Sequence, residues 1–427
     1  MIIQNNHLFQ ARRKRLFNRM DDGSVALIFS GVPKIKSEDE DYPFEVQHSF
    51  YYLTGIEEED CCLMLVSNAG ERKEYLFVPP FDPVKQKWYG KRLSLDEASQ
   101  IAGIRNVLVN GSLESRVNAE LCGAYSDFGT VDKAYLDLGP EIKIAAETTT
   151  KDYGETLKKT YPGLVLYDVA PLLMKMRMVK EPEEIECLRA ACATTRLGVQ
   201  ALMAATRPGV REFELSHIFS HVISDDNACN GLSFNTIVAS GKHACTLHYP
   251  HPLGTLKDGD MLLLDCGARQ GYYCGDVSRS FPVNGKFTPI QKTIYEIVLG
   301  ANKAVAQMAR PGVTIQELQS LASTYMANEC VAHGLLEKKE DITKVYWHSV
   351  SHHIGLDCHD VSDRQTKLEA GNVISDEPGL YFEELGIGVR IEDDLYITEK
   401  GCEVLTADII KEVEDIEAFF AGGKRPF

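Results

Sequence analysis

Apolar residues recur at helical spacing along two long stretches of the C-terminal half of the chain. The first stretch begins at Pro182, a residue that the opening turn of a helix tolerates, and its apolar positions repeat every three or four residues. The second begins at Thr288 and stops at an Arg-Pro-Gly triplet, because proline cannot continue a helix. Thr314 and Glu317 follow with the spacing of a capping box, so another helix is predicted to start there.

Short apolar runs alternate with polar, partly helical segments in the N-terminal part of the chain, a pattern typical of an α/β domain. A chain of 427 residues also exceeds what one hydrophobic core usually serves. We therefore predict a smaller N-terminal α/β domain, residues 1–173, and a larger domain, residues 174–427. The runs that fit strands in the smaller domain cover residues 25–29, 61–66, 74–78 and 133–138.

The C-terminal half repeats two of its own segments in the same order. Residues 207–215 read RPGVREFEL and residues 310–318 read RPGVTIQEL. Residues 256–265 read LKDGDMLLLD and residues 368–377 read LEAGNVISDE. Chance recurrence of Arg-Pro-Gly and Asp-Gly turns is the alternative, but two ordered matches favour a duplicated helix-helix-strand unit. We predict a pseudo-two-fold α+β domain whose central site draws residues from both halves.

Composition places the chain among ordinary globular proteins, with 44% hydrophobic and 25% charged residues. The formal net charge of -17 disfavours nucleic acid as a partner. No segment approaches the roughly 18 uninterrupted apolar residues of a membrane helix, and no signal-peptide core is visible, so we expect no membrane contact and a cytoplasmic location. The twelve cysteines are scattered without a CxxC pair, which indicates reduced, mostly buried thiols.

Four consecutive basic residues occupy positions 12–15, close to the N-terminus. Leu16, Phe17 and Met20 belong to the same segment and would supply the apolar face of an amphipathic helix. We interpret the basic run as the solvated face of that helix and assign it no binding function.

Two aspartates flank a short polar turn between two β-prone runs. A two-residue loop at Gln270-Gly271 would place Asp265 directly opposite Asp276, with Cβ atoms about 5 Å apart. Two like charges at that distance destabilise an ordinary sheet, and the apolar run before Asp265 places it near the core. A divalent cation would neutralise the pair. An exposed hairpin in another register is the alternative that this pair alone leaves open.

Matching acids occur in the second copy of the repeat. Glu377 precedes a Pro-Gly turn and aligns with Asp265. Glu392 lies in a strand-like segment, where Arg390 points to the same face by the two-residue period of a strand. Glu392 then corresponds to Asp276, and we predict that two acids from each half converge on one centre.

Histidines supply the remaining type of ligand. A lone histidine is usually a satisfied polar residue, but four within twelve positions are hard to place as core filling. In the first copy His248 precedes its glycine at nearly the spacing of His359 in the second, so the repeat also offers a pair of histidines beside the acids. The cluster of four consists of His348, His352, His353 and His359.

Four carboxylates and one imidazole would balance the charge of two divalent ions. An oxygen-rich set without thiolate favours Mn²⁺ or Mg²⁺ over structural Zn²⁺, while Co²⁺, Fe²⁺ and Zn²⁺ stay open. Two such ions polarise a carbonyl and stabilise the tetrahedral intermediate that forms when water attacks it. Hydrolysis is therefore the predicted class of reaction.

The C-terminal motifs resemble those of the pita-bread metallopeptidase family, which includes aminopeptidase P, prolidase and methionine aminopeptidase. LLLDCG, CGDVSRSF, SHHIGLDCHD, DEPGLY and GVRIEDD fit the five ligand motifs of that family in order, within about residues 180–410. The resemblance implies a pita-bread catalytic domain holding two divalent ions, with Mn²⁺ as the first choice. The ligands it implies are Asp265, Asp276, His352, Glu377 and Glu392, with Asp276 and Glu392 bridging both ions.

The resemblance also implies roles for residues around the ligands. His248 and His359 would bind substrate and assist the movement of charge and protons, and His348 fits a third catalytic histidine. Tyr381 and Arg390 fit positions just behind the ligands, and we group them with the candidate substrate-binding residues.

Two departures from the family pattern flank the ligand His352. Proline-specific members often read HGLSHWLG where this chain reads HSVSHHIG, so Ser349 replaces a glycine and His353 a tryptophan. The change at His353 bears on packing or substrate preference beside the ligand.

The N-terminal half resembles the leading domain of the aminopeptidase P type in DDGSVALIFSG, DYPFEVQHSFYYLTG and KWYGKRL. That domain implies a homodimer or homotetramer and closure over the substrate. Trp88 matches a position near the site of a neighbouring subunit and joins the candidate substrate-binding residues; a buried structural tryptophan is the alternative.

The resemblance implies an Xaa-Pro aminopeptidase, which releases the N-terminal residue from peptides with proline in second position. Because a proline amide has no N–H, peptidases that need that donor are handicapped, whereas a dinuclear site activates the carbonyl without it. Xaa-Pro dipeptidase, or prolidase, is the nearest alternative, and the ligands do not separate the two. A non-catalytic peptide-binding module on the same fold is a remote alternative, because such relatives lack the ligand set.

Overall fold

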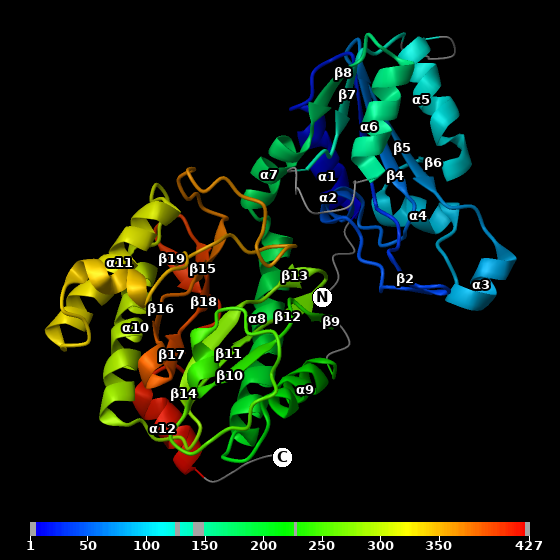
Figure 1. The fold of residues 1–427 in the computed structure, drawn as a ribbon. Coiled ribbons are helices and arrows are strands. Elements are labelled where there is room, and N and C mark those ends of the chain that lie inside the picture. The colour runs from blue at the N-terminus through cyan, green and yellow to red at the C-terminus, as the bar shows by residue number, and fades with distance from the viewer. Residues whose placement is uncertain (1–5, 124–128, 140–148, 226–228, 423–427) are drawn as a thin grey trace. The chain divides into compact units, whose positions relative to one another are not determined.

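The computed structural model describes residues 6–123, 129–139, 149–225 and 229–422. The chain folds as two compact units, residues 4–175 and residues 176–427 (Figure 1). Among the helices in the described ranges, none is long and apolar enough to cross a membrane. All twelve cysteines are free and only Cys122 is exposed, which confirms the prediction of mostly shielded thiols.

A six-stranded mixed sheet forms the centre of the smaller unit, in the order β6-β5-β4-β1-β7-β8. β1 pairs antiparallel with β4 and parallel with β7, so the predicted strands at 25–29, 61–66 and 133–138 lie side by side. The elements are α1 (Asn6–Phe17), β1 (Ser24–Phe29), β2 (Ile35–Ser37), β3 (Glu40–Asp41), α2 (His48–Thr54), β4 (Cys62–Asn68), β5 (Glu71–Val78), α3 (Pro83–Tyr89), α4 (Leu95–Ala102), β6 (Asn106–Val109), α5 (Leu113–Cys122), β7 (Lys133–Leu136), α6 (Thr149–Thr160), β8 (Val165–Asp168) and α7 (Ala170–Met178), the last of which continues past residue 175.

The basic run at 12–15 does form part of a helix, α1, and Lys14 is exposed as predicted, but the interpretation as a solvated face is wrong for Arg12 and Arg13. Arg12 and Arg13 are completely buried. Their guanidinium groups donate to the carbonyl oxygens of Tyr52 and Leu53, at 3.0 and 2.8 Å, and Arg13 also pairs with Glu74. Those carbonyls belong to the last turn of α2, where the helix supplies no N–H donors for its final carbonyl groups. Arginine therefore caps a neighbouring helix here.

Strands of the larger unit lie between a pair of helices on either side, α8 with α9 and α10 with α11 (Figure 1). The elements are α8 (Pro182–Ala205), α9 (Glu212–Ile223), β9 (Cys229–Leu232), β10 (Ile237–Ser240), β11 (Met261–Cys266), β12 (Ala268–Gln270), β13 (Tyr273–Cys274), β14 (Val277–Pro282), α10 (Pro289–Met308), α11 (Ile315–Ala332), β15 (Val373–Asp376), β16 (Gly379–Phe382), β17 (Ile387–Arg390), β18 (Asp393–Ile397), β19 (Cys402–Val404) and α12 (Val413–Ala421). The helices predicted at Pro182 and after Thr288 are confirmed, and so is the capping box of Thr314 and Glu317.

Equivalent hydrogen bonds support the predicted duplication. The amide of Gly209 donates to the carbonyl of Leu256 at 2.9 Å, and the amide of Gly312 donates to that of Leu368 at 2.8 Å. Both glycines have a positive φ near +90°, which a side chain would oppose. Each half thus closes its helix-helix-strand unit with the same turn, and the α+β class with a pseudo-two-fold repeat is confirmed.

The predicted register of the hairpin between Asp265 and Asp276 is wrong. β11 and β14 pair so that Asp265 lies opposite Ser278, and the turn is Gly271-Tyr272, with both residues at positive φ. The error equals two residues along one strand. Because side chains alternate with a period of two, a shift of two leaves Asp265 and Asp276 on the same face as diagonal neighbours.

Candidate metal centre

Each predicted acid stands where a strand of the larger unit begins or ends. Asp265 lies near the end of β11 and Glu377 directly follows β15, while Asp276 and Glu392 directly precede β14 and β18. Each half therefore presents one acid at the end of a strand and one acid just before the start of another strand. This equivalence is the structural counterpart of the aligned repeats.

Side-chain atoms of Asp276, His352 and Glu392 all lie within 4.8 Å of one another, and these side chains are buried. Nε2 of His352 is 3.4 Å from Oδ2 of Asp276 and 3.6 Å from Oε1 of Glu377. Asp265 adjoins the group, because the charge of Asp276 acts on its carboxyl. The structure thus brings the five predicted ligand side chains together.

Burial and mutual repulsion make this cluster unfavourable for free carboxylates. Removal from water raises the pKa of Asp265, Glu377 and Glu392, and the charge of Asp276 raises each of them further. In the described part of the chain, no group donates a hydrogen bond to Oδ1 of Asp265, although that atom is buried. A cation among the side chains would supply both the missing charge and the missing partner.

The donor set fits divalent ions with a preference for oxygen. Asp265, Asp276, Glu377 and Glu392 offer carboxylate oxygens, and His352 offers one imidazole nitrogen. Nδ1 of His352 lies 3.0 Å from the carbonyl of His353, a contact that leaves Nε2 toward the acids. Asp276, His352 and Glu392 lie close enough together to hold one ion, with Asp265 and Glu377 beside them.

Arg390 links three groups behind the acids. Its guanidinium donates to Oδ2 of Asp265 at 2.6 Å, to Oγ of Ser278 at 2.7 Å and to the hydroxyl of Tyr381 at 3.1 Å. Ser278 in turn donates to Oε2 of Glu392 at 2.8 Å. Arg390 and Tyr381 are almost fully buried, so these contacts favour support of the ligands over contact with substrate. Their assignment as substrate-binding residues stays a prediction.

His348 is held in a neutral form by this network. Burial and the charge of Arg390 lower its pKa to about 4. Nδ1 lies 2.9 Å from the carbonyl of Ser349 and therefore carries the proton, which leaves Nε2 to accept from the hydroxyl of Tyr381 at 2.8 Å. His348 thus holds Tyr381, whose oxygen accepts from Arg390.

His248 and His359 are the exposed histidines of the predicted set. The ring of His359 lies against that of the predicted ligand His352, with centroids 4.0 Å apart. Burial and the charge of His352 lower the pKa of His359, and His248 acts on the same group and on His348. The three predicted catalytic histidines therefore face one region beside the acids.

His353 differs from these exposed histidines because its side chain is buried. It is 1% exposed, and burial and the charge of Lys180 lower its pKa to about 3. Its backbone carbonyl accepts from Nδ1 of His352 and from the amide of Asp360. Its burial favours an effect of this substitution on packing beside the predicted ligand, and the effect itself stays a prediction.

Sequence reasoning missed several groups that contact the predicted ligands. The thiol of Cys358 donates to Oδ2 of Asp276 at 3.0 Å, and Asp394 accepts from the amide of Asp276 at 3.1 Å. Ser278, two residues after Asp276 on the same strand, could have been found from the two-residue period. Cys358 and Asp394 lie within the matched segments SHHIGLDCHD and GVRIEDD but carry no pattern of their own.

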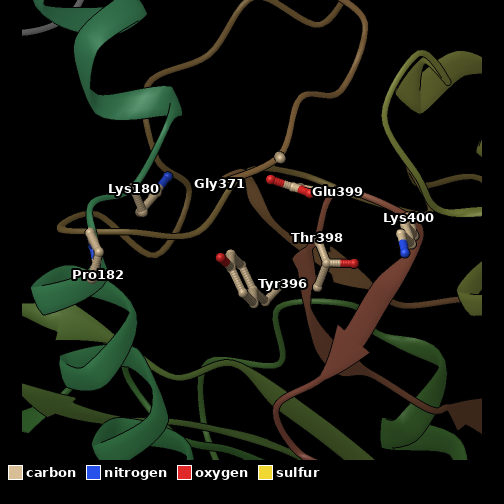
Figure 2. A pocket seen from close by; sticks show the side chains of 8 residues that line it. Lys180, Pro182, Gly371, Tyr396, Thr398, Glu399 and Lys400 are labelled. Carbon is tan, nitrogen blue, oxygen red and sulfur yellow. The ribbon is translucent and has the colours of Figure 1, made fainter.

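Basic residues that follow residue 175 hold the segment with His359. Arg177 donates to Asp357 and Asp360, each at 2.6 Å, and Lys180 donates to Asp360 at 3.0 Å. A pocket of about 490 Å³ opens beside Lys180, with Tyr396 and Thr398 on its other side (Figure 2). Its lining includes none of the predicted ligands or histidines. We assign this pocket no function.

Trp88 lies in the smaller unit, on α3, and its side chain is 80% exposed. The alternative of a buried structural tryptophan is therefore wrong for the single chain. No residue of α3 is buried. Its predicted contact with the site of a neighbouring subunit stays a prediction.

Comparison with known proteins identifies the family that shares this arrangement. The model of Metallopeptidase family M24 matches residues 186–399, which include all five clustered side chains. The chain belongs to this family. A second family model, the aminopeptidase P N-terminal domain, matches residues 9–126. M24 membership indicates a metal-dependent hydrolase. The second match covers strands β1 to β6 of the smaller unit.

Individual M24 relatives match over nearly the whole chain. The Xaa-Pro aminopeptidase of Escherichia coli K12 is 35% identical and covers 98% of both proteins. A Bacillus anthracis structure assigned as an aminopeptidase P is 38% identical, with a TM-score of 0.95 over 98% of this chain and 99% of that one. Escherichia coli aminopeptidase P with the inhibitor Pro-Leu is 33% identical, with a TM-score of 0.89 over 99% of each.

Proposed function

We propose that this M24 chain is an Xaa-Pro aminopeptidase, which hydrolyses the bond before proline in second position of a peptide. The observation that carries the proposal is the convergence of four carboxylates and one imidazole on one buried centre. The full-length similarity to Xaa-Pro aminopeptidases supports the substrate class. Peptides with proline in second position are the proposed partners, and nucleic acid and membranes are not among them.

The proposed cofactor is a pair of divalent ions, with Mn²⁺ first and Co²⁺, Fe²⁺ or Zn²⁺ as substitutes. Asp265, Asp276, His352, Glu377 and Glu392 would hold them, and Asp276 and Glu392 would bridge both. When bound, such ions polarise the scissile carbonyl and lower the pKa of the attacking water.

The side chains around the acids have separate tasks in the proposal. His248 and His359, both exposed, donate hydrogen bonds to the oxygen on which charge develops. The proton that the attacking water loses reaches the departing proline nitrogen through the carboxylates and these histidines. Arg390 fixes the carboxylate of Asp265, and His348 fixes Tyr381. This division assigns binding and proton transfer to the accessible imidazoles and orientation to the buried groups.

Peptide length separates this function from that of prolidase. We expect metal-free protein to be inactive and Mn²⁺ to restore cleavage of Xaa-Pro-Yaa-Zaa, while Xaa-Ala-Yaa-Zaa stays intact. The measurement is product release from a peptide panel after addition of each metal in turn. Cleavage restricted to the dipeptide Xaa-Pro would make the chain a prolidase. A chain that binds no metal and cleaves no peptide would instead be the non-catalytic binding module.

The smaller unit is proposed to build a homodimer or homotetramer and to close over substrate, with residues 1–173 as its extent and residues 174–427 as the catalytic domain. Support comes from α3, on which Val84, Trp88 and Tyr89 are 61%, 80% and 70% exposed, and from Phe81, which is exposed just before the helix. A cluster of exposed apolar groups of this kind usually marks a contact surface. A cytoplasmic location belongs to the same proposal.

Light scattering tests the assembly. We expect a dimer or tetramer for the native chain and a smaller species for Trp88→Ser combined with Tyr89→Ser, because both substitutions remove apolar surface from α3. Leu197→Ser, at another exposed apolar position, is the control and keeps the native mass. A native chain that scatters as a monomer at all concentrations contradicts the assembly.

A further inference from the structure

Glu212 is a buried carboxylate that the metal centre does not use. It stands in the first turn of α9 and is 0% exposed. Oε1 accepts from the amide of Ser240 at 2.9 Å and from its hydroxyl at 2.7 Å, and it faces Nδ1 of His243 at 2.9 Å. Oε2 accepts from the amide of Gly254 at 2.7 Å. One side chain therefore contacts the two ends of a single loop, residues 241–254.

The backbone at Gly254 lies in close contact with the carboxylate of Glu212. A Cβ atom at position 254 would lie 2.7 Å from Cδ of Glu212, too close for a side chain to fit. The backbone amide of Glu212 also donates to the carbonyl of Gly254 at 3.0 Å. Backbone and side chain of one residue thus hold the same glycine, which fixes the end of the loop.

The loop carries His248, and Glu212 also contacts a residue within the loop, His243. His243, which faces Glu212, stacks on Tyr249 with ring centroids 4.5 Å apart and planes 20° apart. Tyr249 is the neighbour of His248 in the chain. A short helical turn at Gly241–Cys245 packs closely on β17. The contact leaves no room for a side chain at Gly388, where a Cβ would lie 2.1 Å from the carbonyl oxygen of Ala244.

A bland explanation for Glu212 is its favourable place at a helix N-terminus, where a negative charge is stabilised. The hydrogen bonds argue for more than that. Every group that hydrogen-bonds to the carboxylate of Glu212 comes from the loop or its flanks, and none comes from the first turn of α9. Burial raises the pKa of Glu212, but hydrogen bonds from His243, Ser240 and Gly254 outweigh burial and lower it, so the group stays charged.

We infer that Glu212 is a positioning residue that fastens both ends of the loop 241–254 and thereby orients His248 toward the substrate. The inference rests on the proposed function in one respect, the role of His248. The fastening of the loop itself is independent of that role.

Glu212→Gln tests the inference with little change of shape. A glutamine has one oxygen and one NH₂ group, so one of the two loop ends meets a donor where it needs an acceptor. Glu214→Gln is the matched control, because Glu214 lies in the same turn but accepts from the amide of Arg211 and not from the loop. The first measurement is amide hydrogen exchange of metal-free protein. We expect residues 241–254 to exchange about tenfold faster in Glu212→Gln and at the native rate in Glu214→Gln.

Kinetics then test the link to His248 in protein loaded with Mn²⁺. We expect kcat to fall about tenfold in Glu212→Gln with little change in KM and unchanged metal content, since the loop holds no ligand. In a His248→Ala background the same substitution should cost less than twofold, because the residue it positions is gone. A structural defect would instead lower both backgrounds equally.

The two experiments distinguish the fastening of the loop, the action of Glu212 through His248 and the proposed peptidase function. Native exchange rates in Glu212→Gln overturn the fastening of the loop. Additive losses in the two backgrounds overturn the action through His248. A native protein without peptidase activity overturns the proposed function, while the exchange rates still decide whether Glu212 holds the loop.

Discussion

Replacing Asp276 with asparagine is expected to remove metal-dependent turnover and leave the fold intact. Asp276 contacts His352, and its charge acts on Asp265, Glu377 and Glu392, so it is central to the cluster. Loss of this proposed metal ligand should forfeit several kcal/mol of transition-state stabilisation, which lowers kcat/KM by about a thousandfold or more.

The stability of the metal-free protein should not fall with this substitution, although the activity does. The asparagine removes one of several mutually repelling carboxylates, so metal-free Asp276→Asn should melt at the native temperature or above it. Added Mn²⁺ should raise the melting temperature of the native protein, because it binds only the folded state, and should have little effect on the variant. Differential scanning calorimetry with and without Mn²⁺ measures both effects.

Asp408→Asn is the control for this experiment, because Asp408 is exposed and lies outside the cluster. It should keep native turnover and the native response to Mn²⁺. Substantial metal-dependent activity in Asp276→Asn would refute the ligand assignment.

The acids could be placed from the sequence because the chain repeats them. Duplication aligned Asp265 with Glu377, and the two-residue period of a strand sets the face on which Asp276 lies. The hairpin register was wrong by two residues, yet the face was right, because an even shift preserves it. An error of one residue would have pointed Asp276 away from Asp265.

Groups that act through backbone carbonyls could not be placed in this way. Arg12 and Arg13 look like a solvated basic run, because nothing local shows that the carbonyls of Tyr52 and Leu53 need donors. Glu212 looks like an ordinary acid in the first turn of a helix, and its contact with Gly254 appears only in three dimensions. Periodicity predicts faces of elements, whereas these contacts depend on how distant elements meet.

Arg279 also contacts residues that are distant in the sequence, which periodicity could not predict. Its replacement has the largest expected effect on stability. It is 1% exposed and donates to Oδ1 of Asp393 at 2.8 Å. It also donates to the carbonyl oxygens of Ser278, Glu392, Ile409 and Ile410. Although burial favours the neutral acid, the charges of Arg279 and Lys411 lower the pKa of Asp393, so the network is ionic.

Arg279→Met is expected to destabilise the larger unit by about 3–5 kcal/mol, the usual cost of removing one partner from a buried ion pair. Methionine fills much of the space of the arginine stem but donates no hydrogen bond, so four carbonyls lose a donor inside the protein. Arg279→Lys should recover only part of the loss, because one ammonium cannot reach all five acceptors. Urea unfolding of the metal-free protein gives the difference without the contribution of bound metal.

Arg189→Met provides the matched control, since Arg189 pairs with Glu403 at the surface of the same unit, where the two side chains are 36% and 43% exposed. Solvent screens that pair, so its loss should cost less than about 1 kcal/mol. Both variants remove the same guanidinium and add the same thioether, and they differ in burial and in the number of acceptors left without a donor. Equal shifts for the two variants would mean that the buried network adds no stability beyond that of a surface pair.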